Sequence, residues 1–175
     1  VSAFLVDQCL SIGQEKVDSK ENEIIAIPRL LDSLELHKGD VVTIDAIGTQ
    51  KDIVSKVIEK QANYLLEVKG NQPSLMESIQ DAMEAVRRFR ECEYVKEFTE
   101  RDESHGLIVN RTCRTCSDLY FLGRIFKEWE GIKTFGYIDN WRINKATGED
   151  LTERHYFITS LENDPKRILK FKRKH

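Results

Sequence analysis

The chain has 175 residues, 40% of them hydrophobic and 33% charged, with a formal net charge of −3, which is typical of one globular domain. This balance argues against a dedicated, strongly basic nucleic-acid module, although DNA can still bind through a local patch. No apolar run approaches the length of a membrane span and no signal peptide is recognised, so we expect a cytoplasmic protein without a membrane partner.

The first predicted elements are a β-hairpin and a helix. Residues 1–8 and 11–17 have strand-like patterns separated by a tight turn. Over residues 22–36 apolar side chains recur at helical spacing, and Pro28 is expected to mark the start of the regular part of that helix. The two hairpin strands are expected to pair antiparallel within the main sheet of the protein.

A strand–helix–strand unit follows the first helix. The β-branched run Val41–Ile44 predicts a buried strand that ends at Asp45, and residues 51–60 carry the apolar stripe of a helix. Residues 64–68 form the next buried strand. Two strands joined in this way are parallel, with a right-handed crossover. We therefore expect Asp45 to end a central strand of a mixed sheet.

The second half of the chain is predicted to be one long helix followed by β structure. The helix runs from Pro73 to about residue 91, and Asp164 is expected to cap a final helix. Strand-like patterns between these helices cover residues 94–99, 107–116, 133–144 and 151–160. Four apolar residues of the third strand share a face, and we interpret them as core packing rather than as a base-stacking platform: Phe135, Tyr137, Trp141 and Ile143.

The four cysteines do not predict a zinc site. Cys113 and Cys116 have C-x-x-C spacing, but Cys9 and Cys92 do not supply the second close pair that structural zinc sites use. Cys113 and Cys116 also fall in a predicted strand, where their odd spacing places them on opposite faces. We expect buried or half-buried thiols.

Asp45 is the strongest candidate for a functional residue. Open α/β sheets place their chemistry at the carboxyl ends of strands, where Asp45 lies. The alternative is that Asp45 caps the next helix. Thr49 competes for that role, because Thr49-Gln50-Lys51-Asp52 has the form of a capping box. The local pattern alone leaves both interpretations of Asp45 open.

Two linked motifs surround this position. The first is T-I-D-A-x-G-x-Q over Thr43–Gln50, and the second is Y-x-L-x-x-K-G-N-Q over Tyr64–Gln72. In this order they resemble the transposases of bacterial insertion sequences known as H-repeat-associated proteins, within the wider DDE transposase group. The resemblance covers almost the whole chain and includes V-S-A-F, G-Q-x-K-V-D, N-E-I-x-A-I-P-x-L-L-D and His105-Gly106.

This resemblance implies an α/β chain with a mixed sheet, a ribonuclease H-like fold and a β-rich insertion. Residues 1–175 would form a single domain. Within it, residues 1–91 would be the sheet-and-helix core, residues 92–160 the insertion, and residues 164–175 the start of a final helix.

The resemblance also implies a function in cutting and joining DNA at insertion-sequence ends. DDE transposases use three carboxylates to hold two divalent cations, Mg²⁺ or Mn²⁺, and Asp45 corresponds to the middle carboxylate. The first Asp of the family belongs to a D-G-K motif and the last Glu to a W-x-I-E-N motif, and this sequence contains neither. We therefore expect the polypeptide alone to be catalytically inert and to bind no metal ion. A homodimer is left open.

Three polar residues of the second motif are candidates for DNA contacts. Lys69, Asn71 and Gln72 follow a buried strand, from which they could contact phosphates and position DNA without reading its sequence. The alternative is a polar loop that caps the helix beginning at Pro73.

Arg111 is a further candidate DNA contact. It matches the last arginine of the family pattern H-G-R-x-E-x-R, whereas Leu107 and Val109 stand in place of the first Arg and the Glu. This departure puts the function of the loop in doubt. We interpret His105 as a hairpin-turn residue rather than as a metal ligand.

The end of the chain is strongly basic. These cations form either a DNA-binding patch or a solvated helix end favoured by the helix dipole, and both interpretations stay open: Lys166, Arg167, Lys170, Lys172, Arg173 and Lys174.

Three functions therefore compete. The first is the central catalytic part of a DDE transposase. The second is a non-catalytic transposase remnant with weak, salt-sensitive DNA binding. The third is an unrelated hydrolytic or phosphoryl-transfer domain with Asp45 as nucleophile, for which the sequence offers no convincing set of supporting polar residues.

Overall fold

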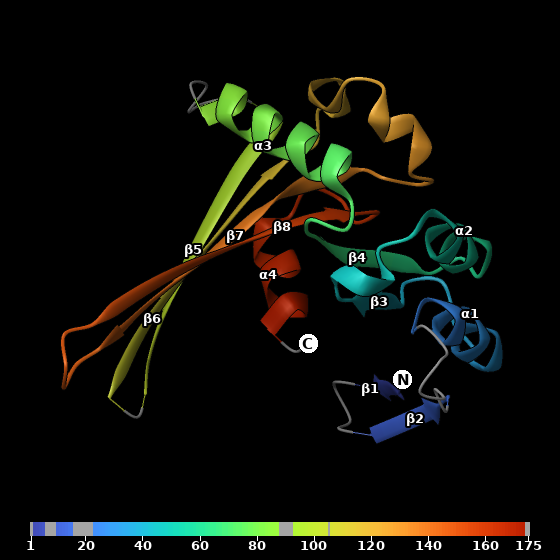
Figure 1. Cartoon of the computed structure of the whole chain (residues 1–175), viewed down its shortest axis with the longest axis horizontal. Helices are drawn as coiled ribbons and strands as arrows, with labels where there is room; N and C mark the ends of the chain where they lie inside the picture. Colours follow the sequence, from blue (N-terminus) through green and yellow to red (C-terminus); the bar gives the residue numbers. More distant parts are fainter. Residues whose placement is uncertain (1, 6–9, 16–22, 88–92, 105, 174–175) are drawn as a thin grey trace.

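A six-stranded mixed sheet organises the chain in the computed structural model (Figure 1), which describes residues 2–5, 10–15, 23–87, 93–104 and 106–173. The strand order is β3-β4-β8-β7-β6-β5. The strands are β3 (Val41–Ile44), β4 (Asn63–Val68), β5 (Val95–Ser104), β6 (Leu107–Cys116), β7 (Thr134–Asn144) and β8 (Asp150–Thr159).

One pair in this sheet is parallel. Strands β3 and β4 run in the same direction and are joined by helix α2 (Lys51–Glu59), as predicted for the strand–helix–strand unit. The other neighbours pair antiparallel, including β8 with β4. The chain therefore has the predicted mixed α/β character of a ribonuclease H-like fold. The strands of the predicted insertion continue the same sheet as β3 and β4.

Helices cover the two faces of the sheet unequally. Helices α1 (Glu23–Ser33), α2 and α3 (Pro73–Arg87) pack on one face, and α4 (Pro165–Arg173) packs on the other, which we call the α4 face (Figure 1). The larger core lies under the three helices, and its fully buried members include Ile53, Val57, Tyr64, Leu66, Ile79 and Phe135. The α4 face has a smaller core around Leu65, Ile138, Phe157, Ile168 and Leu169.

The N-terminal hairpin does not join this sheet. Strands β1 (Ser2–Leu5) and β2 (Leu10–Gln14) pair antiparallel with each other and form a separate two-stranded sheet. The prediction that they extend the main sheet was wrong for the described residues. Gly13 of β2 instead lies against α1, since an added Cβ would be 3.0 Å from Leu30. Strand patterns reveal local pairing, but they do not reveal which surface a hairpin packs against.

Helix α1 also differs from its prediction. It runs from Glu23 to Ser33, so Pro28 lies inside the helix rather than at its start. Pro28 is its sixth residue, and the first four N–H groups of a helix lack partners in any case. The proline therefore removes only one internal hydrogen bond from an early turn, and the buried Ile27, Leu30 and Leu31 hold the helix against its neighbours.

Three strands of the second half follow their predictions closely, whereas β5, predicted over residues 94–99, runs from Val95 to Ser104. Strand β6 has the predicted limits, β7 begins one residue later than predicted, and β8 both begins and ends one residue earlier. Asp164 caps α4 as predicted, because its Oδ1 accepts a hydrogen bond from the Arg167 N–H at 3.0 Å. Of the four apolar residues assigned to the core in β7, Phe135 is fully buried and the others are half-buried.

The prediction of buried thiols is confirmed for two cysteines. Cys113 and Cys116 are both fully buried, and they belong to the cores on opposite faces of the sheet. Burial, with a further effect of Asp164, raises the pKa of Cys113 to about 12, so its thiol stays protonated. Cys9 and Cys92 lie outside the described residues.

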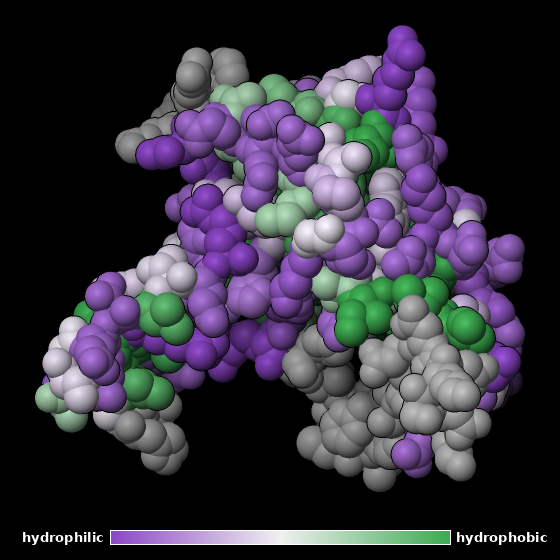
Figure 2. Space-filling model, in the orientation of Figure 1, coloured by the Kyte–Doolittle hydropathy of each residue, from purple (hydrophilic) through white to green (hydrophobic). Residues whose placement is uncertain are grey.

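Beyond the helices, strands β5–β8 extend as a twisted ribbon, at the lower left of Figure 1. The surface in Figure 2 is largely hydrophilic, with hydrophobic atoms near the far end of this ribbon and in the region of α1. Leu107 and Leu151 are exposed in the ribbon, and Ile25 is exposed on α1. In the part of the chain that the structure describes, no helix is long and apolar enough to cross a membrane.

Candidate functional site

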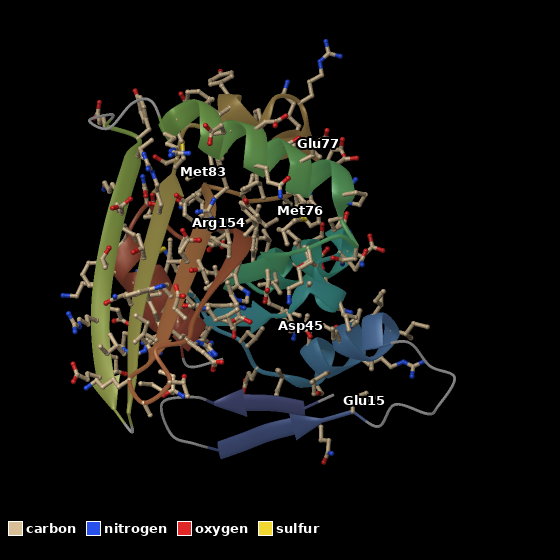
Figure 3. The ribbon with its side chains drawn as sticks, turned by 60° about the vertical axis from the view of Figure 1, so that its left-hand side comes forward. Glu15, Asp45, Met76, Glu77, Met83 and Arg154 are labelled. Carbon is tan, nitrogen blue, oxygen red and sulfur yellow. The ribbon has the colours of Figure 1, made fainter. Side chains whose placement is uncertain are left out.

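Asp45 lies directly after β3, where the chain enters the short 3₁₀ helix η2 (Ala46–Gly48; Figure 3). It occupies the cap position of η2, but its side chain makes no capping hydrogen bond. The side chain is exposed, and among the described residues no partner for its carboxylate is found. The carboxylate is therefore available to a ligand, and the capping interpretation is not supported.

The strand that Asp45 ends is not central. Among the described residues β3 is the edge of the six-stranded sheet, with β4 as its neighbour. The prediction of a central strand was wrong for the same reason as the hairpin prediction, because β1 and β2 do not pair with the free side of β3.

Thr49 does not cap α2 as the capping-box pattern predicted. The cap residue is Gln50, and Thr49 is fully buried one residue earlier. The Thr49 Oγ1 donates a hydrogen bond to the Glu67 carbonyl oxygen at 2.6 Å and also lies 3.3 Å from the Asp45 carbonyl oxygen. A buried hydroxyl group needs a hydrogen-bond acceptor, and for Thr49 that acceptor is the backbone carbonyl of Glu67 in β4. Thr49 thus connects the ends of β3 and β4.

The loop after β4 makes two further contacts with the Asp45 segment. Asn71 Nδ2 donates to the Ala46 carbonyl oxygen at 2.5 Å, and Gln72 Nε2 donates to the Thr49 carbonyl oxygen at 2.8 Å. Gln72 Nε2 is also 3.3 Å from Gln50 Oε1. The two motifs identified in the sequence are therefore hydrogen-bonded to each other.

Glu67 on β4 is the centre of a charged cluster on the α4 face. The β3–β4 register pairs Ile44 with Leu66, so Asp45 lies level with Glu67, one residue further along. Glu67 is only 6% exposed. Its carboxylate lies 2.7 Å from His155 Nδ1, 2.8 Å from Lys172 Nζ and 2.9 Å from Lys69 Nζ.

The partners of Glu67 decide its ionisation. Burial alone would raise its pKa, but hydrogen bonds with His155, Lys172 and Lys69 outweigh that effect and lower the pKa to about 2. Glu67 is therefore an anion that fixes three cationic or ionisable side chains beside the end of β3. Lys69 remains more than half exposed, so it can still face a ligand.

Arg111 lies in a different part of the sheet. In the order β3-β4-β8-β7-β6 its strand is four positions from β3, or roughly 19 Å at about 4.8 Å per strand. Its Nη1 is 3.6 Å from Glu100 Oε1 and 3.9 Å from Asp102 Oδ2. The structure does not bring Arg111 together with Asp45, and a DNA contact by Arg111 stays a prediction. His105 lies outside the described residues.

The basic C-terminal helix is partly neutralised within the chain. Lys172 contacts Glu67, while Arg173 contacts Glu100 at 3.0 Å and Asp102 at 3.7 Å. These two cations hold α4 against the sheet. Lys166, Arg167 and Lys170 are exposed and keep open the interpretation as a DNA-binding patch.

Comparison with known proteins finds named transposases among the chain's relatives. The chain is 37% identical over 175 residues to "Putative transposase YncI" of Escherichia coli O157:H7. The aligned region covers 95% of this chain and 42% of that protein. The chain is 32% identical over 163 residues to "H repeat-associated putative transposase YhhI" of Escherichia coli K12, covering 91% of this chain and 42% of the relative. Over most of its own length the chain is therefore similar to H-repeat-associated transposases.

Another relative aligns with a similar share of this chain. "Uncharacterized protein in dhlA 3'region" of Xanthobacter autotrophicus is 35% identical over 163 residues, covering 93% of this chain and 53% of that protein. The chain thus spans about half the length of the curated relatives it matches, or slightly less. No family model matches the sequence.

The fit of a divalent cation can be judged from the side chains present. Asp45 offers carboxylate oxygens, which hard cations prefer, and these oxygens have no competing partner among the described residues. However, no group of three or more His, Cys, Asp or Glu side chains that could hold a metal ion occurs in the described ranges. Asp45 therefore fits the role of one ligand within a larger set.

The sequence motif contained Glu67, but its role was not recognised. A charged residue in the apolar run Tyr64–Val68 was an available signal, because buried glutamates are rare unless paired. The identity of its partners was not readable. His155 and Lys172 are 88 and 105 residues away in sequence, and only the folded sheet and α4 bring them to Glu67.

Proposed function

We propose that this chain forms part of a transposase that cuts and joins DNA phosphodiesters at insertion-sequence ends, with Asp45 as a metal-binding carboxylate. The observation that carries the proposal is the exposed, unpartnered carboxylate of Asp45 at the end of β3, within a motif of the H-repeat-associated family. A carboxylate with no internal partner has no evident structural role, and that supports a functional one.

Mg²⁺ or Mn²⁺ bound with Asp45 would activate the attacking oxygen and stabilise the leaving oxygen of a phosphodiester. The chain's own contribution is to hold Asp45 at the sheet edge and to place cations beside it. Glu67 holds Lys69 and Lys172 at the end of β4, the strand next to β3, where positive charge would attract the DNA backbone.

Lys69 is the best-supported of the proposed DNA contacts. Its ammonium is more than half exposed even though it pairs with Glu67. Next to it, Gly70 has open space around the position of a Cβ, so a phosphate could approach the backbone closely. The amide nitrogens of Asn71 and Gln72 already donate to the Asp45 segment, so we assign any DNA contact of these residues to their remaining polar atoms.

A second function remains in competition, a non-catalytic remnant that binds DNA weakly. It is favoured by the lack of a three-carboxylate group among the described residues, and by Leu107 and Val109 in the pattern that follows His105-Gly106. On either proposal the 175-residue polypeptide alone does not cleave DNA. A homodimer stays a prediction.

The test is strand cleavage by the complete reading frame that contains this chain, incubated with insertion-sequence ends and Mn²⁺. Asp45→Asn should reduce cleavage by at least about 10³-fold, as expected when a metal-binding carboxylate loses its charge, without changing thermal stability. The matched control is Asp52→Asn, an exposed aspartate in the first turn of α2. Cleavage that survives Asp45→Asn would contradict the proposal, and a frame that never cleaves would favour the remnant.

A further inference from the structure

Asp45 is followed by a segment that is too short to be stable by itself. Helix η2 has three residues, and a single 3₁₀ turn has poor hydrogen-bond geometry. Within the segment, the Thr49 N–H bonds to the Ala46 carbonyl oxygen at 3.1 Å and the Gln50 N–H to the Gly48 carbonyl oxygen at 2.9 Å. The path of the chain after Asp45 must therefore be fixed mainly by contacts from outside the segment.

The loop after β4 supplies such contacts at both ends of η2. Asn71 Nδ2 donates to the Ala46 carbonyl oxygen, directly after Asp45, and Gln72 Nε2 donates to the Thr49 carbonyl oxygen, just beyond η2. The donors are adjacent residues and the acceptors are three residues apart, so the two bonds span the whole turn. Together they fix both its position and its orientation.

The opposite side of the turn is held by packing. Gly48 is buried, and a Cβ at that position would lie 2.2 Å from Ile44 Cγ2 and 2.8 Å from Ile27 Cδ1. The turn is therefore pressed between β3 and α1. The Thr49 hydroxyl adds a third polar contact through the Glu67 carbonyl oxygen. The Asn71 and Gln72 bonds reach the backbone of the turn, the Thr49 bond joins its side chain to β4, and none of these contacts uses the Asp45 carboxylate.

We infer that Asn71 and Gln72 are positioning residues that hold the Asp45 carboxylate in place through the η2 backbone. The inference rests on the proposed function for the role of Asp45. It explains why T-I-D-A-x-G-x-Q and K-G-N-Q occur as a pair, since the side chains of the second motif bond to the main chain of the first.

The experiment compares the unsubstituted chain with the double variant Asn71→Ala/Gln72→Ala. The matched control is Asn163→Ala, because Asn163 Nδ2 also donates to a backbone carbonyl, that of Tyr94, between other elements. The first readout is amide hydrogen exchange at Thr49 and Gln50. The second is paramagnetic broadening of backbone NMR signals around Asp45 in millimolar Mn²⁺, which detects weak encounters far short of stable occupancy.

In the double variant, exchange at Thr49 and Gln50 should accelerate at least tenfold, and Mn²⁺ broadening around Asp45 should weaken at least threefold. The Asn163→Ala control should leave both readouts unchanged. The thermal unfolding midpoint of the double variant should fall no further than that of the control, which separates positioning from a general structural role.

Two results would overturn the inference alone. They are unchanged exchange at Thr49 and Gln50 in the double variant, and Mn²⁺ broadening that the double variant retains in full. A third result has a wider consequence. If the unsubstituted chain shows no broadening around Asp45, the proposed metal-binding role of Asp45 fails, and the positioning role fails with it.

Discussion

Two charged clusters on the α4 face show how differently this sheet uses its ionisable side chains. At the covered end, Glu67 is almost fully buried and has three close partners, from the loop after β4, from β8 and from α4. In the ribbon, Glu100 and Asp102 contact Arg111 and Arg173, with separations from 3.0 to 3.9 Å. Helix α4 supplies one cation to each cluster.

The two clusters differ in hydrogen bonding as well as in burial. Glu67 receives well-formed bonds, whereas Glu100 Oε1 and Arg111 Nη1 are buried atoms for which no hydrogen-bond partner is found among the described residues. A buried anion is stabilising only when its bonds are satisfied. Charge is therefore fixed most firmly at the covered end of the sheet, around Glu67.

The largest effect should come from Glu67→Gln. The variant loses the anion that pairs with His155, Lys172 and Lys69, and the low pKa of Glu67 corresponds to about 3 kcal/mol of native-state stabilisation at neutral pH. We expect the free energy of unfolding to fall by about that amount in urea denaturation. If the free energy of unfolding falls by less than about 0.5 kcal/mol, the Glu67 cluster is not held more firmly than the ribbon cluster.

Lowering the pH should remove the stabilisation by ionised Glu67 in the unsubstituted chain. Because the folded-state pKa of Glu67 is lowered from 4.5 to about 2, its stabilisation is present above about pH 4.5 and is lost as the pH falls toward 2. Urea denaturation at several pH values should therefore show the difference between the unsubstituted chain and Glu67→Gln shrinking across this window. A difference that stays constant down to pH 2 would mean that Glu67 is not the titrating group.

A smaller effect is expected from Glu100→Gln in the ribbon. Asp102 remains as a partner for both arginines, and Arg173 is 44% exposed, so solvent screens the interaction. The free energy of unfolding should fall by less than about 1 kcal/mol. If Glu100→Gln destabilises the chain as much as Glu67→Gln, the burial of Glu67 does not make its cluster more stabilising than the ribbon cluster.

The smallest effect on stability is expected from Gly70→Ala. No atom lies within 4 Å of the added Cβ, and the backbone at Gly70 is not left-handed. Stability should therefore stay within about 0.5 kcal/mol of the unsubstituted chain. DNA binding, measured by fluorescence anisotropy at low salt, should nevertheless weaken about threefold if a phosphate approaches this backbone. Equal binding would place the DNA elsewhere.

Local pattern predicted most of this fold. The β-branched run before Asp45, the helix of residues 51–60 and strands β6, β7 and β8 formed close to their predicted limits, because their periodicity reflects one buried face. Strand β5 extends five residues beyond its predicted end at residue 99. The position of the β1–β2 hairpin was not predictable in this way. Its packing on α1 depends on surfaces that exist only after both elements have folded.

The site was predicted in part. The end of β3 and the linked motifs made Asp45 a candidate, which stays a prediction, whereas the spacing of Thr49 to Asp52 predicted a helix cap at Thr49. In the structure the Thr49 hydroxyl bonds to β4 instead, since the parallel pairing brings the Glu67 carbonyl oxygen within reach. Contacts between loops, such as those of Asn71 and Gln72, depend on strand register and cannot be read from spacing alone.

The most direct test of Asp45 as a metal ligand is a change of metal preference. In the complete reading frame, Asp45→Cys would replace an oxygen ligand by sulfur, which Mg²⁺ tolerates poorly and softer divalent cations such as Mn²⁺ tolerate better. Asp45→Cys should abolish strand cleavage in Mg²⁺ and retain part of it in Mn²⁺. Unchanged cleavage in Mg²⁺, or an equal loss with both metals, would contradict direct coordination by Asp45.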